Sequence, residues 1–285
     1  MSESAISTPL GEILASLAPQ MAKGLQINPA ELQQAAHEAV TGKILQGDEV
    51  YVLYADVLGF RAQLQTDAAQ LEKRLENALT QTNFGILARV PGGFRIHPDG
   101  RKEQMPIVGL TQLNPASIFS DSLFLVSHDD SDESLRQIAH AANTAFVNFF
   151  GESLPLRGAI AKGKVWWNRN TDVRLGTGIT RAYDLAEGLD CVGIAIDAEL
   201  PHPANSIGPV PFPAKGKTTG PLTEDLRVPL QLGRNSLPMA FRRDLVDAFR
   251  EFLKRPENTA SPKLRARYSN SLPIIEAMAR DPVSA

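Results

Sequence analysis

Four apolar segments of this chain have the composition and spacing of β-strands. Residues 49–55 alternate between polar or small and large apolar side chains and are rich in Val and Tyr. Residues 116–127 contain two apolar runs separated by Ser120-Asp121-Ser122, which predicts a hairpin. Residues 156–163 and 191–196 predict two further strands, of which the second is apolar throughout.

Between and around these strands, apolar residues recur every three or four positions, which is the period of a helix with one buried face. The predicted helices cover residues 8–46 (with a break at Gly24), 60–87, 132–149, 175–187, 238–253 and 262–280. From residue 49 to residue 163 the order is strand, helix, strand, strand, helix, strand. This order predicts an α+β fold, a ferredoxin-like βαββαβ sandwich with added N- and C-terminal helices.

Changes in composition divide the chain into a central domain and two flanking parts. Residues 1–46 are predicted to form an N-terminal helical extension, and residues 47–200 the central domain. Residues 88–113 are rich in Gly, Pro and charge, which predicts a hairpin or exposed insert. Residues 201–285 are predicted to supply a proline-rich loop, a strand and C-terminal helices that pack on the same domain.

Composition narrows the class of protein. The chain has 285 residues, of which 43% are hydrophobic, enough for a substantial core. A formal net charge of −3 with mixed signs argues against binding to long nucleic acids. Cys191 stands alone, which excludes an intrachain disulfide and fits a reducing compartment. Because no apolar run approaches the roughly 20 residues of a membrane span, we expect a cytoplasmic protein.

Two aspartates at the ends of strand-like runs are the leading candidates for chemistry. Asp56 ends the first run and precedes Val57-Leu58-Gly59-Phe60, and Asp121 occupies the centre of the predicted hairpin. Adjacent strands that carry one carboxylate each would bring both to the same divalent cations, as in two-metal phosphoryl-transfer sites. We therefore predict that Asp56, Asp121 and Val57 hold two divalent cations. The alternative role for both aspartates is helix capping or a turn.

Residues near these aspartates are candidates for substrate binding. The turn from Val57 through Leu58 and Gly59 to Phe60 opens a helix, so its backbone N–H groups are predicted to bind β- and γ-phosphates. Arg157 is predicted to clamp phosphate with its forked donors, or else to form a surface ion pair.

Tyr54 lies two residues before Asp56, so both side chains point to the same face of the strand. In a site that binds a nucleotide, its ring would stack on the base while it fills space that a purine would need. The alternative is an aromatic side chain half-buried in the core.

Four segments resemble the catalytic domain of class III nucleotide cyclases. Residues 56–60 resemble the family's Asp-Ile-x-Gly-Phe signature, and Ser120-Asp121-Ser122 resembles the hairpin with its second metal-binding aspartate. Residues 157–163 resemble the Arg-x-Gly-Ile-x-x-Gly strand, and residues 176–185 resemble the dimerisation-arm segment. The resemblance covers about residues 49–197. It implies attack of the ribose 3′-hydroxyl on the α-phosphorus, with pyrophosphate as the leaving group.

Several side chains depart from the pattern of the purine-specific members. Ser117 and Val173 occupy the positions where those members carry a lysine and an acidic or similar residue. Thr180 and Asp184 occupy the positions of the transition-state asparagine and arginine. Arg181 is adjacent to Thr180 and is predicted to supply the missing positive charge, so both Thr180 and Arg181 are candidate catalytic residues.

Within the class, the first strand, the hairpin and the Arg-Ala-Tyr-x-Leu-Ala-Glu helix most resemble the pyrimidine cyclases of bacterial Pycsar antiphage systems. This resemblance implies synthesis of cyclic UMP or cyclic CMP by a manganese- or magnesium-dependent homodimer with composite sites. It also implies a separate effector protein that senses the product. UTP is favoured because it is the commoner substrate in that group.

Three other functions remain open from the sequence. The protein could be a cytidylate cyclase, or an adenylate or guanylate cyclase that recognises its base through other residues. It could also be a catalytically silent sensor domain that binds a nucleotide or a partner. The presence of both Asp56 and Asp121 argues against the silent domain, because a binding module would not need two carboxylates on the metal side.

Overall fold

A computed structural model describes residues 44–87, 94–96, 102–104, 113–168, 173–201, 226–227, 239–255 and 262–279. Nearly all of the predicted N-terminal extension and nearly all of the proline-rich segment 201–223 lie outside these ranges. No helix in the described part of the chain is long and apolar enough to cross a membrane.

The centre of the protein is a mixed seven-stranded sheet in the order β4-β5-β1-β6-β8-β9, with β7 paired to β6 outside this path. Its strands are β1 (Leu45–Val57), β4 (Ser117–Phe119), β5 (Ser122–Val126), β6 (Leu156–Asn168), β7 (Val173–Leu175), β8 (Gly193–Asp197) and β9 (Leu226–Arg227). β1 pairs antiparallel with both β5 and β6, whereas β6 and β8 are parallel. The spatial order of β4, β5, β1 and β6 is that of a ferredoxin-like sandwich, which confirms the predicted fold class.

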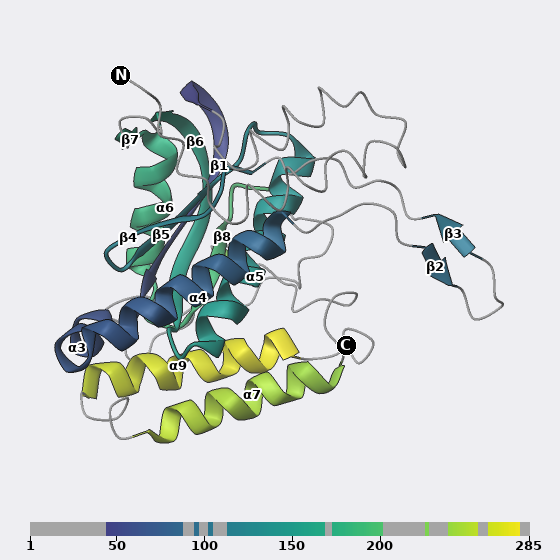
Figure 1. The fold of residues 1–285 in the computed structure, drawn as a ribbon. Coiled ribbons are helices and arrows are strands. Elements are labelled where there is room, and N and C mark those ends of the chain that lie inside the picture. The colour runs from purple at the N-terminus through teal and green to yellow at the C-terminus, as the bar shows by residue number, and fades with distance from the viewer. Residues whose placement is uncertain are drawn as a thin grey trace, which may run out of the picture.

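Helices cover both faces of this sheet (Figure 1). α4 (Ala68–Leu87) and α5 (Asp132–Gly151) lie on one face, and α6 (Thr177–Gly188) lies on the other. The short α3 (Phe60–Thr66) precedes α4. The C-terminal helices α7 (Met239–Lys254) and α9 (Pro262–Ala279) run side by side beside the end of α5.

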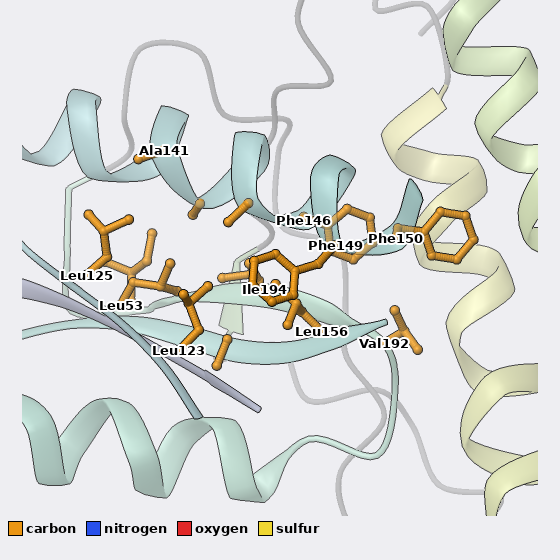
Figure 2. Packing of buried hydrophobic residues seen from close by; sticks show 14 of the residues in the cluster. Leu53, Leu123, Leu125, Ala141, Phe146, Phe149, Phe150, Leu156, Val192 and Ile194 are labelled. Carbon is orange, nitrogen blue, oxygen red and sulfur yellow. The ribbon is translucent and has the colours of Figure 1, made fainter. Parts of the chain in front are cut away.

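The larger hydrophobic core lies between the sheet and α5. Leu53, Leu123 and Leu125 point from β1 and β5 toward α5, whose Phe146 and Phe149 fill the same core (Figure 2). All five are buried, and burial of each such side chain contributes about 1.5–3 kcal/mol.

The core continues into the C-terminal helices through aromatic contacts. Phe150, the next residue of α5, packs on Phe249 and Phe252 of α7, with ring centroids 5.5 and 5.6 Å apart. Phe252 in turn packs on Tyr268 of α9. The C-terminal helices therefore share the hydrophobic core of the central domain.

Several predicted boundaries differ from the structure. β1 begins at Leu45, inside the segment predicted as N-terminal helix, and β6 continues past the predicted 163 to Asn168. Two further differences have a clear local cause. The helix expected over residues 60–87 is divided at Asp67, whose backbone is extended and whose carboxylate accepts a hydrogen bond from the Gln70 amide at 3.0 Å. Asp67 thus caps a new helix instead of continuing the old one. The strand expected over 191–196 begins at Gly193, because the buried Cys191 and Val192 form the bend before it.

The segment 88–113 contains a separate two-stranded sheet. β2 (Phe94–Ile96) pairs antiparallel with β3 (Lys102–Gln104). Neither strand pairs with the seven-stranded sheet, and Figure 1 shows both strands apart from it.

Two glycines bring α6 into direct contact with β6. A Cβ atom added to Gly163 would lie 2.5 Å from the backbone nitrogen of Gly178. A Cβ atom on Gly178 would lie 3.1 Å from the carbonyl oxygen of Gly163. The helix therefore rests on the strand backbone without intervening side chains, which fixes its position over the sheet.

We expect the Gly163→Ala variant to lose about 3 kcal/mol of unfolding free energy, because backbone atoms must move to admit the methyl group. The control is Gly188→Ala at the end of α6, where an added Cβ has no neighbour within 4 Å. Urea denaturation measures both variants. Equal stability of Gly163→Ala and the wild type would contradict the close packing of α6.

Candidate functional site

Asp56 lies near the end of β1, where the neighbouring strands place Ser122 of β5 on one side and Arg157 of β6 on the other. Its side chain is 15% exposed. The two carboxylate oxygens accept hydrogen bonds from Nε and Nη2 of Arg157, both at 3.0 Å. This is a two-pronged, charge-assisted pair with little freedom to rotate.

Arg157 is held by three groups of the protein. Besides its bonds to Asp56, its Nη2 donates to the carboxylate of Glu187 on α6, and its Nη1 donates to the Leu189 carbonyl at 3.2 Å. Its side chain is only 5% exposed. The predicted alternative of a surface ion pair is therefore wrong, because this ion pair is buried where β1 ends, β6 begins and α6 ends.

Burial and the ion pair with Arg157 change the pKa of Asp56 in opposite directions. Burial raises the pKa of Asp56 above its ordinary value, whereas the hydrogen bonds and charge of Arg157 act to lower it. The raised pKa shows that loss of hydration outweighs the ion pair at this carboxyl group.

Asp121 occupies the turn of the β4–β5 hairpin, next to Ser120, whose φ is 56°. The carbonyl oxygen of Asp121 accepts a hydrogen bond from the Val57 amide at 2.8 Å. This bond ties the hairpin to the residue after Asp56. The structure thus brings the two predicted aspartates to the same edge of the sheet.

The turn after Asp56 is partly closed to a ligand. The Val57 amide is bonded to Asp121, and the Leu58 amide donates to the Pro155 carbonyl at 2.9 Å. The expectation that these two N–H groups are free to bind phosphate is therefore wrong for this conformation. Gly59 has a φ of 80° and precedes Phe60, the first residue of α3.

Tyr54 is enclosed by other aromatic side chains. Its ring centroid lies 5.3 Å from that of Phe124 and 5.2 Å from that of Tyr183, both in edge-to-face geometry. Its hydroxyl group lies 3.1 Å from Oγ of Ser122. The ring is buried, whereas Tyr183 on α6 is 45% exposed beside it.

The other two predicted catalytic residues, on α6, lie away from Asp56 within one chain. Arg181 pairs with Asp197 and with Glu199, the latter at 2.8 Å. Gly193 begins β8 beside Arg157 and Asp197 ends it, so Arg181 is held at the opposite end of this strand. The Thr180 hydroxyl donates to the Gly176 carbonyl at 3.2 Å. One chain therefore does not assemble the four predicted catalytic residues.

Sequence reasoning missed two arginines, Arg174 and Arg267. Arg174 of β7 donates to Ser117 Oγ at 2.7 Å, and its guanidinium lies over the rings of Phe124 and Trp167. Its position next to Val173 was the available signal. Arg267 of α9 forms a buried ion pair with Asp190, which no local pattern in the sequence indicates.

Glu187 and Arg267 could not be found from periodicity because their contacts depend on how α6 and α9 dock. Arg267 Nε donates to Asp190 at 3.2 Å in a buried pair. The Ser271 hydroxyl accepts from the Val192 amide at 2.6 Å. These bonds fix the segment that also supplies the Leu189 carbonyl to Arg157.

The donor set at this edge fits a hard divalent cation that arrives with phosphate. No group of three or more His, Cys, Asp or Glu side chains that could hold a metal occurs among the described residues. Mg²⁺, however, is commonly bound through one or two carboxylates with substrate phosphates and water. Asp56 and Asp121 supply two such carboxylates, and the Val57 carbonyl is a third oxygen donor nearby. Both carboxylate oxygens of Asp56, however, already accept hydrogen bonds from Arg157.

Comparisons with known proteins add little to this geometry. No family model matches the sequence, and no curated protein matches it. A class III adenylyl cyclase-like ATP-binding protein from Pseudomonas aeruginosa is similar in structure, with 14% identity and a TM-score of 0.32. The match covers 63% of this chain and 45% of that chain, so this chain spans less than half of that protein. A likeness this weak carries no argument, and the fold assignment rests on the strand order.

We expect Arg157→Met to lower the unfolding free energy by about 3–5 kcal/mol, because it leaves the Asp56 carboxylate buried without its partner. The control is Arg136→Met, which removes an exposed ion pair with Glu133 three residues away on α5. That change should cost no more than about 0.5 kcal/mol. Guanidinium denaturation compares them, and equal losses would contradict the buried character of the Asp56–Arg157 pair.

Proposed function

We propose that this protein is a nucleotide cyclase that converts UTP to 3′,5′-cyclic UMP and pyrophosphate. The observation that carries the proposal is the meeting of Asp56 and Asp121 at one sheet edge, through the pairing of β1 with β5 and the Val57–Asp121 hydrogen bond. Two carboxylates on adjacent strands suit phosphoryl chemistry with divalent cations. The sequence resemblance to class III cyclases supports the same reaction.

Different residues of the chain would bind the metal ions and the phosphate groups. Asp56, Asp121 and the Val57 carbonyl would hold Mn²⁺ or Mg²⁺. Bound cations of this kind supply a lowered pKa for the attacking hydroxyl group and neutralisation of the phosphates. The Gly59 and Phe60 amides, at the start of α3, would bind phosphate oxygens. In the reaction the ribose 3′-oxygen bonds to the α-phosphorus. The bond from that phosphorus to the bridging oxygen of the leaving pyrophosphate breaks, and the proton of the 3′-hydroxyl group passes to water.

Arg157 would serve this reaction by binding phosphate after it leaves Asp56. Its guanidinium supplies forked donors that match phosphate oxygens. In the described structure those donors are bonded to Asp56, Glu187 and Leu189. The phosphate role therefore requires a rearrangement of the ion pair.

Thr180 and Arg181 would act on the substrate of a second copy of the chain. Arg181 is 41% exposed on α6 and lies at the opposite end of β8 from the Asp56 site. A homodimer with composite sites would place it against the partner's nucleotide. The proposed biological role, antiphage signalling through a separate effector that senses cyclic UMP, rests on the resemblance to Pycsar cyclases.

A nucleotide-binding domain without turnover is the second candidate. The observation that favours it is the occupation of both Asp56 oxygens by Arg157. A permanent ion pair there would keep Asp56 from binding a metal ion. The two candidates differ in whether metal and nucleotide can open this pair.

The deciding experiment incubates purified protein with ATP, GTP, CTP and UTP separately in Mn²⁺ and identifies products by mass spectrometry. We expect cyclic UMP and pyrophosphate from UTP. Asp56→Ala and Asp121→Ala should each lower turnover by at least about a hundredfold, equivalent to ~2.7 kcal/mol of barrier, while the fold is retained. Cyclic AMP or cyclic GMP would overturn the substrate assignment. Absence of product, or full activity in either variant, would overturn the proposed mechanism.

Tyr54 tests how the protein selects its base. We expect Tyr54→Ala to weaken pyrimidine turnover or admit purines, because removal of the ring opens space between Phe124 and Tyr183. Tyr54→Phe is the matched control, since it keeps the ring and removes only the hydroxyl near Ser122. Relative kcat/KM for the four triphosphates is the measurement. An unchanged preference in Tyr54→Ala would remove Tyr54 from base selection.

A further inference from the structure

Arg157 takes the place of a cation at Asp56. Its Nε and Nη2 bond both carboxylate oxygens at 3.0 Å, and its positive charge is enclosed with that carboxylate at the end of β1. Each oxygen keeps a further lone pair. A divalent cation that approaches Asp56 would nevertheless meet a guanidinium of the same sign at short range, and like charges in a poorly hydrated site repel strongly.

Glu187 offers this guanidinium a second carboxylate in the same place. It contacts the same Nη2 that bonds Asp56, but it comes from α6 and is 32% exposed. Leu189, just beyond the end of α6, bonds Nη1. The contact of Gly178 with Gly163 fixes α6 over β6, so both acceptors are held independently of Asp56.

The local charges favour the entry of a divalent cation without the loss of Arg157. Asp56 and Glu187 are two carboxylates against the one guanidinium of Arg157, and the Asp121 backbone is bonded to the Val57 amide beside them. Arg267, the other neighbouring cation, is paired with Asp190. The excess negative charge can accommodate a divalent cation, provided that the guanidinium moves away from Asp56.

We propose that Arg157 is the resident cation of Asp56 in the metal-free protein, and that Glu187 is the positioning residue that retains Arg157 when a divalent cation takes Asp56. This inference rests on the metal role of Asp56 in the proposed function. No covalent bond changes in the exchange. The hydrogen bonds from Arg157 to Asp56 are replaced by metal–oxygen bonds, and the guanidinium remains on Glu187 and the Leu189 carbonyl, ready for phosphate.

The exchange is tested with metal alone, so the result does not depend on turnover. The first readout is the ¹⁵N NMR signal of the Arg157 Nε–H group during a Mg²⁺ titration. Arg181 provides an internal control, because it pairs with Asp197 at the other end of β8. We expect Mg²⁺ to shift the Arg157 signal and speed its hydrogen exchange while the Arg181 signal stays unchanged.

The second readout is the Kd for Mn²⁺, measured by electron paramagnetic resonance. We expect the isosteric Glu187→Gln to raise this Kd about threefold or more, because Arg157 then has a poorer alternative to Asp56. Asp184→Asn removes an exposed carboxylate from the same helix as the charge-matched control. It should change the Kd by less than about twofold. Circular dichroism checks that both variants are folded.

Each result supports or overturns the exchange. If Mg²⁺ binds but leaves the Arg157 signal unchanged, Arg157 does not leave Asp56 and the inference fails, even where Glu187→Gln weakens Mn²⁺ binding through direct ligation. If Glu187→Gln and Asp184→Asn change the Kd for Mn²⁺ equally, Glu187 acts only through its charge and does not position Arg157. That result would also overturn the inference. If Mg²⁺ and Mn²⁺ alone do not bind the wild type, the exchange in the metal-bound, nucleotide-free protein does not occur and the inference fails, whereas a metal that arrives with the substrate phosphates remains compatible with the proposed function. If the protein has cyclase activity but Mg²⁺ does not shift the Arg157 Nε–H signal, the proposed function holds and this inference fails.

Discussion

The Asp56–Arg157 ion pair is the interaction on which the candidate site depends. It joins the end of β1 to the start of β6, and through Glu187 and Leu189 it joins both to α6 and the segment after it. A buried pair of this kind only partly offsets the desolvation of its two charges, and removal of either partner leaves the other charge buried without that counter-ion. The paired hydrogen bonds therefore leave the Asp56 carboxylate little freedom to rotate. The proposed chemistry requires this pair to open.

The C-terminal helices support the site although they lie outside the ferredoxin-like core. Arg267 and Ser271 of α9 hold the segment around Asp190 and Val192, from which the Leu189 carbonyl reaches Arg157. Tyr268, on the same helix, is close to Gly59, since a Cβ there would lie 3.6 Å from the Tyr268 hydroxyl. The turn that follows Asp56 is thus covered by a helix that comes roughly two hundred residues later in the chain.

The two ends of α6 serve different parts of the molecule. Its C-terminal end brings Glu187 to Arg157, whereas Arg181 is bound to Asp197 at the far end of β8. A helix that rests on a strand backbone through Gly163 and Gly178 cannot turn to bring both to one site. This geometry is why the proposed reaction calls for a second copy of the chain.

The sequence by itself determined the α+β class, the order of the core elements and the nearness of Asp56 to Asp121, because local periodicity and strand pairing decide these. It could not determine that Val57 and Leu58 amides are bonded, that Tyr54 is enclosed, or that Arg157 is buried between Asp56 and Glu187. Those features depend on how strands and helices far apart in the chain meet. Periodicity reports which face of an element is apolar, and only tertiary packing decides which polar groups find each other across it.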